Sequence, residues 1–244
     1  HWVPTIIEAL EAGMDVMAGM HKRMADIPAI AEAAKMHGRT LFDVRQPSQD
    51  FKVGKGYDRP GKRVLTVGTD CSLGKMFTSL ALEKEMKAQG MNATFRATGQ
   101  SGIFIVGEGV AVDGVISDFI AGAIEWLCPD NDPDHWDVVE GQGSLFHPSF
   151  AGVSLGLLHG AQPDALIMCH EPNRPHMRGV PGRALPSLEE CIALNEQMAH
   201  LTNPAARVVG LSANTSLMSE DEAHAWLEET SQRLGMPCCD SLRT

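Results

Sequence analysis

Hydrophobic residues recur along the chain in short blocks with two different spacings. "RVLTVG" (63–68) and "DALIMCH" (164–170) are compact apolar runs bounded by polar residues, as expected of buried strands. Segments 74–90 and 219–235 instead place apolar residues every three or four positions, which is the period of an amphipathic helix. Their alternation predicts an α/β fold built on a parallel sheet.

From residue 63 onward this alternation is regular and predicts a doubly wound parallel sheet. In such a sheet the functional site lies beyond the carboxyl ends of the strands, where loops open onto a crevice. The predicted strands are 63–68, 92–99, 136–141, 164–170 and 206–214, and the predicted helices are 74–90, 117–127, 154–161, 187–201 and 219–235.

The first fifty residues form a smaller version of the same pattern. We predict a helix, a strand at 15–20, a helix at 26–38 and a strand at 40–45, which are too few strands for a complete sheet. The chain opens without a methionine inside an amphipathic segment, so we expect it to start partway through a domain. A polar, glycine-rich stretch follows. The expected organisation is 1–50, a linker at 51–62, and a second domain at 63–244.

Composition narrows the function without defining it. The formal net charge of −11 argues against nucleic acid or an anionic membrane as a partner, and no apolar run approaches the roughly 18 residues that span a bilayer. The six cysteines show no CxxC spacing, which favours reduced thiols in the cytoplasm. We therefore expect a cytoplasmic protein with a small-molecule substrate that forms a homo-oligomer.

One local basic patch precedes the second domain. It either meets an anionic ligand or is a solvated linker. Its members are Lys52, Lys55, Arg59, Lys62 and Arg63.

"VGTDCSLGKMFT" (67–78) nearly matches a phosphate-binding loop. Gly68, Gly74 and Lys75 fit G-x5-G-K, one residue longer than the common form, between a predicted strand and a predicted helix. Such a turn aims backbone N–H groups and a helix dipole at one point, and the lysine adds a full charge. The alternative is a glycine turn that only packs helix on strand. The expected ligand-binding residues are Gly68, Thr69, Asp70, Cys71, Ser72, Leu73, Gly74, Lys75 and Met76.

Met76 stands where a magnesium-binding hydroxyl is expected. A thioether cannot replace that hard oxygen ligand, which counts against ATP hydrolysis. Thr78 carries a hydroxyl, but it lies two residues further along the helix and faces another direction. Cys71 is either a nucleophile activated by the helix terminus or a thiol that fills space. The pattern favours phosphate capture without phosphoryl chemistry.

Other polar residues follow the predicted strands. Glu140 lies at the end of the predicted strand 136–141. Its carboxylate suits a proton acceptor or a metal ligand, or else it caps a helix. Asp137 is better explained by a structural role. His170 and Arg174 follow another strand, where an arginine fork suits a substrate carboxylate. The histidine spacing matches no zinc motif, so no metal is assigned. Further candidate substrate contacts are Arg96, Thr98, Gln100 and Asp113, the last equally explicable as structural.

Five segments together resemble one family. They are "GTDCSLGKM", "RATGQSG", "DGVISDFIAGAIE", "EGQGSLFHP" and "LLHGAQPDALIMCHEPNR", and they resemble the D-glutamate N-acyltransferase family, long known only as a domain of unknown function. "VMAGMHKRM" and "LFDVR" resemble the end of that family's Rossmann-like amino-terminal domain, whose first part is absent here. The resemblance implies a P-loop NTPase-like second domain preceded by a remnant of that Rossmann-like domain.

The resemblance also implies transfer of an acetyl or other acyl group from acyl-coenzyme A to the amino group of D-glutamate, with acetyl-coenzyme A as the expected co-substrate. On that hypothesis the loop holds coenzyme A phosphates without magnesium and Arg174 binds a glutamate carboxylate. Lys75 belongs to the catalytic set, and Glu140 or His170 removes the amine proton. The loop is also similar to that of dethiobiotin synthetase, which leaves an ATP- and magnesium-dependent ligase or kinase open. A non-catalytic nucleotide-binding module is the third alternative.

Overall fold

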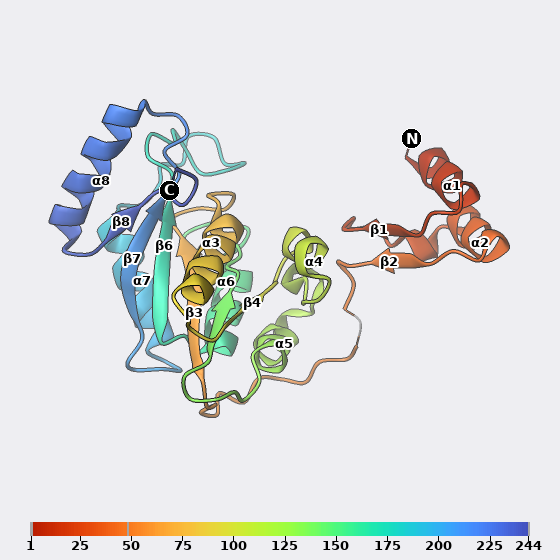
Figure 1. Cartoon of the computed structure of the whole chain (residues 1–244), viewed down its shortest axis with the longest axis horizontal. Coiled ribbons are helices and arrows are strands. Elements are labelled where there is room, and N and C mark those ends of the chain that lie inside the picture. Colours follow the sequence, from red (N-terminus) through yellow and green to blue (C-terminus); the bar gives the residue numbers. More distant parts are fainter. Residues whose placement is uncertain (1, 48, 244) are drawn as a thin grey trace.

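Two parallel sheets make up the core architecture of the chain. The computed structural model describes residues 2–47 and 49–243. Within these residues, a two-stranded sheet lies in the amino-terminal unit and a six-stranded sheet in the remainder (Figure 1). Neighbouring strands run parallel in both sheets. The predicted α/β class with a parallel sheet is therefore confirmed.

The amino-terminal unit is a small helix–strand pair repeated twice. Its elements are α1 (Val3–Glu11), β1 (Val16–Ala18), a 3-10 turn (Met24–Asp26), α2 (Pro28–His37) and β2 (Leu41–Asp43). Pro28 opens α2, where its missing N–H costs nothing, and Gly38 ends it with a left-handed φ of 61°. Leu10, Met24 and Ile30 are fully buried between the helices and the strands. The unit therefore has its own small apolar core.

The larger sheet has the strand order β4-β5-β3-β6-β7-β8. Its central strands are the most apolar, as expected for strands covered on both faces. The strands are β3 (Lys62–Gly68), β4 (Ala93–Arg96), β5 (Trp136–Val139), β6 (Ala165–His170), β7 (Arg207–Ala213) and β8 (Cys238–Cys239). From β3 the chain moves to β4 and β5 on one side, and it then crosses to β6, β7 and β8 on the other side. The strand order therefore reverses at β3. A reversal of this kind opens a crevice at the carboxyl ends.

Helices cover both faces of this sheet. The helices are α3 (Lys75–Ala88), α4 (Gln100–Val106), α5 (Ile120–Leu127), α6 (Ala151–Ala161), α7 (Leu188–Ala199) and α8 (Glu220–Leu234), with 3-10 turns at Val112–Gly114 and Ser117–Phe119. In Figure 1, α3 lies in front of the sheet and α6 and α7 lie behind it. The doubly wound arrangement is thus confirmed. None of the described helices has the length and apolarity needed to cross a membrane.

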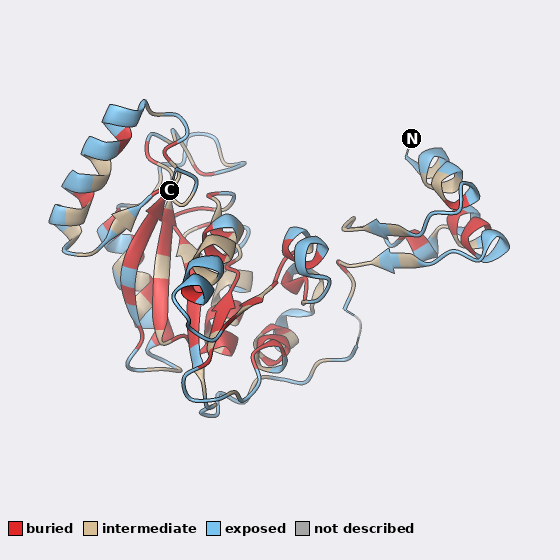
Figure 2. Ribbon diagram, in the orientation of Figure 1, coloured by how far each residue is buried: buried red, intermediate tan, exposed pale blue. Residues whose placement is uncertain are grey.

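Figure 2 shows the burial that results, with the central strands almost wholly buried and α8 largely exposed. The main apolar cluster joins β3, β6 and β7 to α5, α6 and α7, and includes Leu166 and Ile124, both fully buried. A second cluster packs Met86 of α3 against Val64 and Val138 on the opposite face. The loops at the carboxyl ends of the strands therefore stand on a rigid support.

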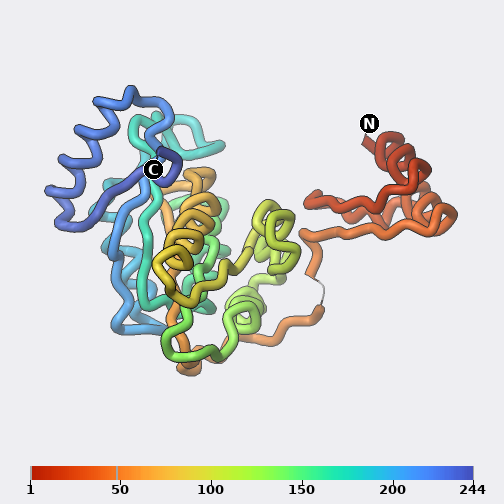
Figure 3. Tube along the Cα trace, in the orientation of Figure 1, coloured from red at the N-terminus to blue at the C-terminus, as the bar shows by residue number. Residues whose placement is uncertain are grey.

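The segment before β3 runs in an extended path beside α5 (Figure 3). The Arg59 guanidinium donates to the carbonyl oxygens of Cys128 at 2.7 Å and Gly160 at 2.5 Å. Arg63 is buried at the start of β3, with its backbone N–H donating to Asp164. Two members of the basic patch thus hold the segment against the domain and are not the solvated linker residues that one interpretation expected, and the anionic-ligand alternative stays a prediction.

Two elements were missing from the sequence prediction. Residues 100–106 form α4, a short helix bounded by Gly99 and by Gly107, which has a left-handed φ of 82°. Its apolar sequence lacks a polar face, so no helical period is visible over seven residues. β8 has only two residues, Cys238 and Cys239, and forms through pairing with β7. Its existence depends on a long-range contact rather than on local pattern.

Candidate functional site

A cavity of about 300 Å³ opens at the carboxyl ends of β3, β4 and β5. Three connecting segments form its walls: the loop between β3 and α3, the start of α4, and the turn after β5. The lining residues are Cys71, Ser72, Leu73, Gly74, Lys75, Met76, Gly99, Gln100, Ser101, Glu140, Gly141, Gln142 and Gly143. A larger cavity of about 540 Å³ lies between α8 and β8, but it contains none of these residues.

The β3–α3 loop presents backbone N–H groups to the cavity. Ser72 and Gly74 both have left-handed backbones, with φ of 54° and 97°, which coil the loop ahead of α3. No described side chain caps the amino end of α3, so its first N–H groups remain available. A coiled loop followed by a free helix amino end is the common main-chain device for binding an anion.

Lys75 lies beneath this loop and is nearly fully buried. Its Nζ donates to the carbonyl oxygen of Asp70 at 2.8 Å, which holds the ammonium group in the bend of the loop. Burial lowers the pKa of Lys75. An anion bound in the loop would favour the charged form again, because an opposite charge offsets the loss of hydration. The lysine is thus positioned to respond to a phosphate.

Met76 lines the cavity and also packs against apolar residues. It packs against a cluster that includes Ile103 of α4 and Phe95 of β4, together with Val44 of the amino-terminal unit. The nearby hydroxyl of Thr78 lies 2.9 Å from the Ser212 hydroxyl, is buried, and does not line the cavity. The side of the loop where a magnesium ligand is expected is therefore apolar.

Glu140 is a buried carboxylate at the back of the cavity. Its Oε2 accepts from the backbone N–H groups of Thr98 at 2.9 Å and Gly99 at 3.1 Å. Burial raises the pKa of Glu140 despite these donors. A Cβ on Gly99 would lie 3.2 Å from Oε1, and one on Gly102 would lie 2.5 Å from Oε2. The two glycines allow the carboxylate to sit this close to the α4 backbone.

Thr98 and Gln142 support Glu140 from the side. The Thr98 hydroxyl donates to the Glu140 carbonyl oxygen at 2.6 Å and accepts from the Gln142 amide at 3.1 Å. Thr98 is fully buried and does not line the cavity. Its hydroxyl is therefore engaged within the protein, whereas Gln100 does line the cavity.

Arg174 lies on the opposite side of the loop, and both terminal nitrogens of its guanidinium donate to protein acceptors. It donates to the Asp70 carboxylate at 2.9 Å and to the carbonyl oxygens of Cys71 and Ser72, both at 2.8 Å. It also pairs with Glu171 at 2.7 Å. The arginine thus fixes the shape of the phosphate loop, and its donors have protein acceptors.

Asp70 is the buried partner of that arginine. Burial alone would raise the pKa of Asp70, but N–H donation from Arg178, Arg174 and Cys71 outweighs it and lowers the pKa. The carboxylate is therefore ionised inside the loop, where its charge is compensated by donors on both sides.

His170 contacts the loop from below. Its Nδ1 lies 3.0 Å from the Thr69 hydroxyl, and its ring stacks on Trp226 with the centroids 5.8 Å apart. Burial lowers the pKa of His170 to about 4, with the Glu171 charge opposing the shift and the Arg174 charge adding to it. The imidazole is neutral at pH 7 and does not line the cavity.

Two predicted substrate contacts lie elsewhere. The Arg96 Nε donates to Asp137 at 2.7 Å, on the side of β4 away from the phosphate loop. Asp113 pairs with Arg45 of the amino-terminal unit. Neither residue lines the cavity with Lys75, because each is held by a charged partner far away in the sequence. Their predicted substrate roles stay predictions.

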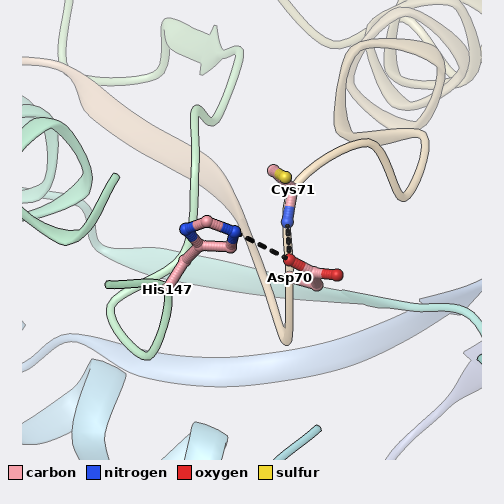
Figure 4. Close-up of side chains that lie close together, drawn as sticks. All are labelled: Asp70, Cys71 and His147. Atoms are coloured by element: carbon pink, nitrogen blue, oxygen red, sulfur yellow. Dashed lines mark hydrogen bonds and ion pairs between the residues drawn. The ribbon is translucent and has the colours of Figure 1, made fainter. Parts of the chain in front are cut away.

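Figure 4 shows Asp70, Cys71 and His147 close together, with possible metal-ligating atoms within 4.8 Å of one another. Both ring nitrogens of His147 already have partners. Nδ1 accepts from the Ser149 N–H at 3.2 Å, and Nε2 lies 2.9 Å from the Arg178 carbonyl oxygen. We therefore interpret the cluster as part of the loop's hydrogen-bond network. Burial also raises the pKa of Cys71, which disfavours a nucleophilic thiolate.

The amino-terminal unit closes one rim of the cavity. A Cβ on Gly19 would lie 2.7 Å from both Cβ and Cγ of Gln100, so the backbone at Gly19 is in contact with the Gln100 side chain. Arg45 is largely buried, and its Nε donates to the Gly19 carbonyl oxygen at 2.8 Å. With Val44 packed near Met76, these contacts bring the ends of β1 and β2 against α4. Domain packing therefore shapes the cavity wall.

Sequence reasoning did not single out Ser101 and Gln142 as site residues. Both line the cavity. A signal was present for Gln142, which lies between Gly141 and Gly143 directly after Glu140. Glycines on both sides of a polar residue at a strand end allow close ligand approach.

Comparison with protein families gives two adjoining matches. A family described as a domain of unknown function, the DUF1611_C P-loop domain, matches residues 50–244. The DUF1611_N Rossmann-like domain matches residues 1–47. A parallel α/β sheet with a phosphate loop and a Rossmann-like amino-terminal part are thus supported by sequence as well as by structure. The linker bounds of 51–62 stay a prediction.

Individual relatives match almost the whole chain. Proteins named D-glutamate N-acetyltransferase from Pseudoalteromonas sp and Tritonibacter scottomollicae are 55% and 52% identical over 242 residues, covering 99% of this chain and 73% of each relative. A crystal structure of a DUF1611 protein from Anabaena variabilis is 37% identical, with a TM-score of 0.90, covering 98% of this chain and 70% of that one. The similarity extends across both units of the chain.

Proposed function

The chain belongs to the DUF1611 family, and from this premise we propose that it transfers an acetyl group from acetyl-coenzyme A to the amino group of D-glutamate. The observation that carries the proposal is the identity of more than half of the residues with two relatives named for that reaction. The family resemblance drawn from the sequence is confirmed. The acyl donor, the acceptor and the residue roles below are our proposal.

The phosphate loop is the proposed seat of the donor. Coenzyme A carries a diphosphate and a 3′-phosphate, which need N–H donors and cations but no magnesium for catalysis. The free N–H groups at the start of α3 and the buried Lys75 supply such partners. The apolar packing of Met76 is compatible with a ligand whose phosphates are held but not cleaved.

Glu140 is the proposed base. An amine attacks a thioester only when it is neutral, so one proton must leave the acceptor's ammonium group. In the proposed step, the amine nitrogen bonds to the acetyl carbon, Glu140 accepts the proton, and the carbon–sulfur bond breaks. The nitrogen loses a second proton as it becomes an amide, and the departing thiolate takes up that proton. The raised pKa of Glu140 brings it closer to working pH than an ordinary carboxylate.

The structure leads us to revise three of the roles expected from the sequence. His170 lies below the loop and Arg174 is occupied, so we propose that they position the loop rather than touch substrate. Thr98 orients Glu140. Gln100 and Ser101 line the cavity beside Glu140 and are the proposed contacts of the acceptor.

The test is a direct assay of purified protein by mass spectrometry. Acetyl-coenzyme A or Mg-ATP is offered with D-glutamate or L-glutamate, with and without EDTA. We expect N-acetyl-D-glutamate from the acetyl donor, and EDTA should not affect it. Glu140→Gln should lower kcat by about 100-fold or more, as expected for a lost general base. Nucleotide cleavage without acetyl transfer would instead support the ligase or kinase alternative.

A further inference from the structure

The segment between β6 and α7 forms a charged rim beside the phosphate loop, outside the lining of the cavity. Residues 171–187 leave the end of β6 and fold back on themselves, with the Met177 N–H donating to the Arg183 carbonyl oxygen at 2.8 Å. Met177 is buried, which anchors the turn in the protein. The segment is therefore a structured rim beside residues 70–72 of the phosphate loop.

Asp70 joins this rim to the phosphate loop. Its Oδ2 accepts from the Arg178 backbone N–H at 2.7 Å as well as from Arg174. On the other side, the Arg178 carbonyl oxygen lies 2.9 Å from Nε2 of His147. The backbone of Arg178 is thus held from two directions, next to the residues that line the cavity.

The side chain of Arg178 is in the opposite situation. It is exposed, and it has no ion pair or hydrogen bond with any residue in the described ranges 2–47 and 49–243. Its neighbour Arg174 has protein acceptors for its donors, and Lys75 is the cation among the described lining residues. A fixed backbone with a free guanidinium is an arrangement that suits an anion outside the protein.

Resting on the proposed function, we infer that Arg178 is a second cation for the donor and binds one of its phosphates. Coenzyme A brings three phosphate groups to a cavity whose described lining holds one cation, Lys75, so a guanidinium beside the loop would add favourable charge. A guanidinium offers two parallel N–H donors that match a phosphate's oxygens. The same chemistry would fit a carboxylate of the acceptor, and the experiment below separates the two.

The experiment compares Arg178→Ala with wild type in calorimetric titrations with coenzyme A and with pantetheine, which lacks all phosphates. The backbone contacts of Arg178 survive this change, so the variant should fold. We expect coenzyme A to bind about 10- to 100-fold more weakly, as for a lost charged hydrogen bond, and pantetheine to bind unchanged. Arg178→Lys should recover part of the loss because it restores charge without the fork.

Arg207→Ala is the matched control, because this exposed arginine starts β7, at the amino ends of the strands and away from the phosphate loop. It should leave coenzyme A binding unchanged. Unaltered coenzyme A binding in Arg178→Ala would overturn the inference, as would a higher KM for D-glutamate with equal donor affinity. If wild type binds no coenzyme A, the proposed function fails instead. Arg178 is then tested with inorganic pyrophosphate, whose affinity the variant should still reduce.

Discussion

The phosphate loop is flanked by two rims that are stabilised by different interactions. On the α4 side, Met76 packs with apolar residues of two domains, and Gly19 presses against Gln100. On the β6–α7 side, the buried Asp70 carboxylate is held by Arg174 and by backbone donors. One rim is shaped by close packing and the other by charge.

This difference gives a physical reason for the proposal that the phosphate loop binds its ligand without a metal. A magnesium ion needs hard oxygen ligands beside the lysine, and that position is apolar here. Rigidity comes instead from the other rim, where Arg174 donates to two carbonyl oxygens of the loop and pairs with Asp70 and Glu171. The proposed anion site is therefore supported from the Arg174 side of the loop, and not from the Met76 side, where a magnesium ligand is expected.

The largest effect should come from breaking the charged rim. Arg174→Ala would leave Asp70 buried without its main side-chain partner, which costs about 3 kcal/mol of unfolding free energy. Urea unfolding followed by circular dichroism measures this loss, with Arg207→Ala as the exposed control. An effect as small as the control's would show that the rim does not hold the loop.

The apolar rim is tested by Gly19→Ala. The new Cβ would meet Gln100 at 2.7 Å, so we expect a loss of about 1–2 kcal/mol, typical of overpacking. Gly152→Ala is the matched control, because a Cβ there meets nothing within 4 Å. Equal stabilities for the two variants, measured by urea unfolding, would contradict close packing of the amino-terminal unit against α4.

His170 should make the free energy of unfolding depend on pH. The pKa of His170 in the folded protein, about 4, lies below the usual value near 6.5. The contribution of this histidine to stability is therefore fully present above pH 6.5. The unfolded chain binds the proton first as pH falls, and stability is lost between pH 6.5 and 4, by on the order of 3 kcal/mol.

The measurement is urea unfolding at pH 7 and pH 5 for wild type and His170→Gln. The variant should lack the part of the pH-dependent loss that belongs to this histidine. A wild-type slope that the substitution leaves unchanged would place the titration on other groups.

The smallest effect is expected from Met76→Thr, which restores a hydroxyl beside Lys75. It removes apolar contacts with Ile103 and its neighbours, at a cost of about 1 kcal/mol. Met76→Leu, a change of similar volume, should cost less. We expect no magnesium-dependent ATP cleavage by Met76→Thr in a phosphate-release assay. Efficient cleavage would mean that this one side chain had been suppressing nucleotide chemistry.

The sheet and the loop could be predicted from sequence because their signals are local. Apolar runs marked β3 and β6, and Gly68, Gly74 and Lys75 stand in sequence at a strand–helix junction. α4 escaped because seven residues without a polar face show no period. Local pattern therefore identified the scaffold but not every element beside the cavity.

The partners of the charged residues could not be predicted in the same way. Arg174 and Asp70 are 104 residues apart, and Asp113 pairs with Arg45 across 68 residues. A sequence shows that an arginine follows a strand, but packing decides whether it faces a ligand or another part of the chain. Met76 was identified as unusual, yet the sequence could not show that it packs against the same apolar cluster as Val44 of the amino-terminal unit.

The central claim is that main-chain N–H groups and Lys75 hold the donor's phosphates without a metal. The most direct measurement is calorimetric titration of coenzyme A into wild type and Lys75→Ala, each with EDTA and with magnesium. The account predicts equal wild-type affinity in both conditions and about 50-fold weaker binding by Lys75→Ala, the loss of a charged hydrogen bond. Wild-type binding that needs magnesium, or that survives the loss of Lys75, would contradict it.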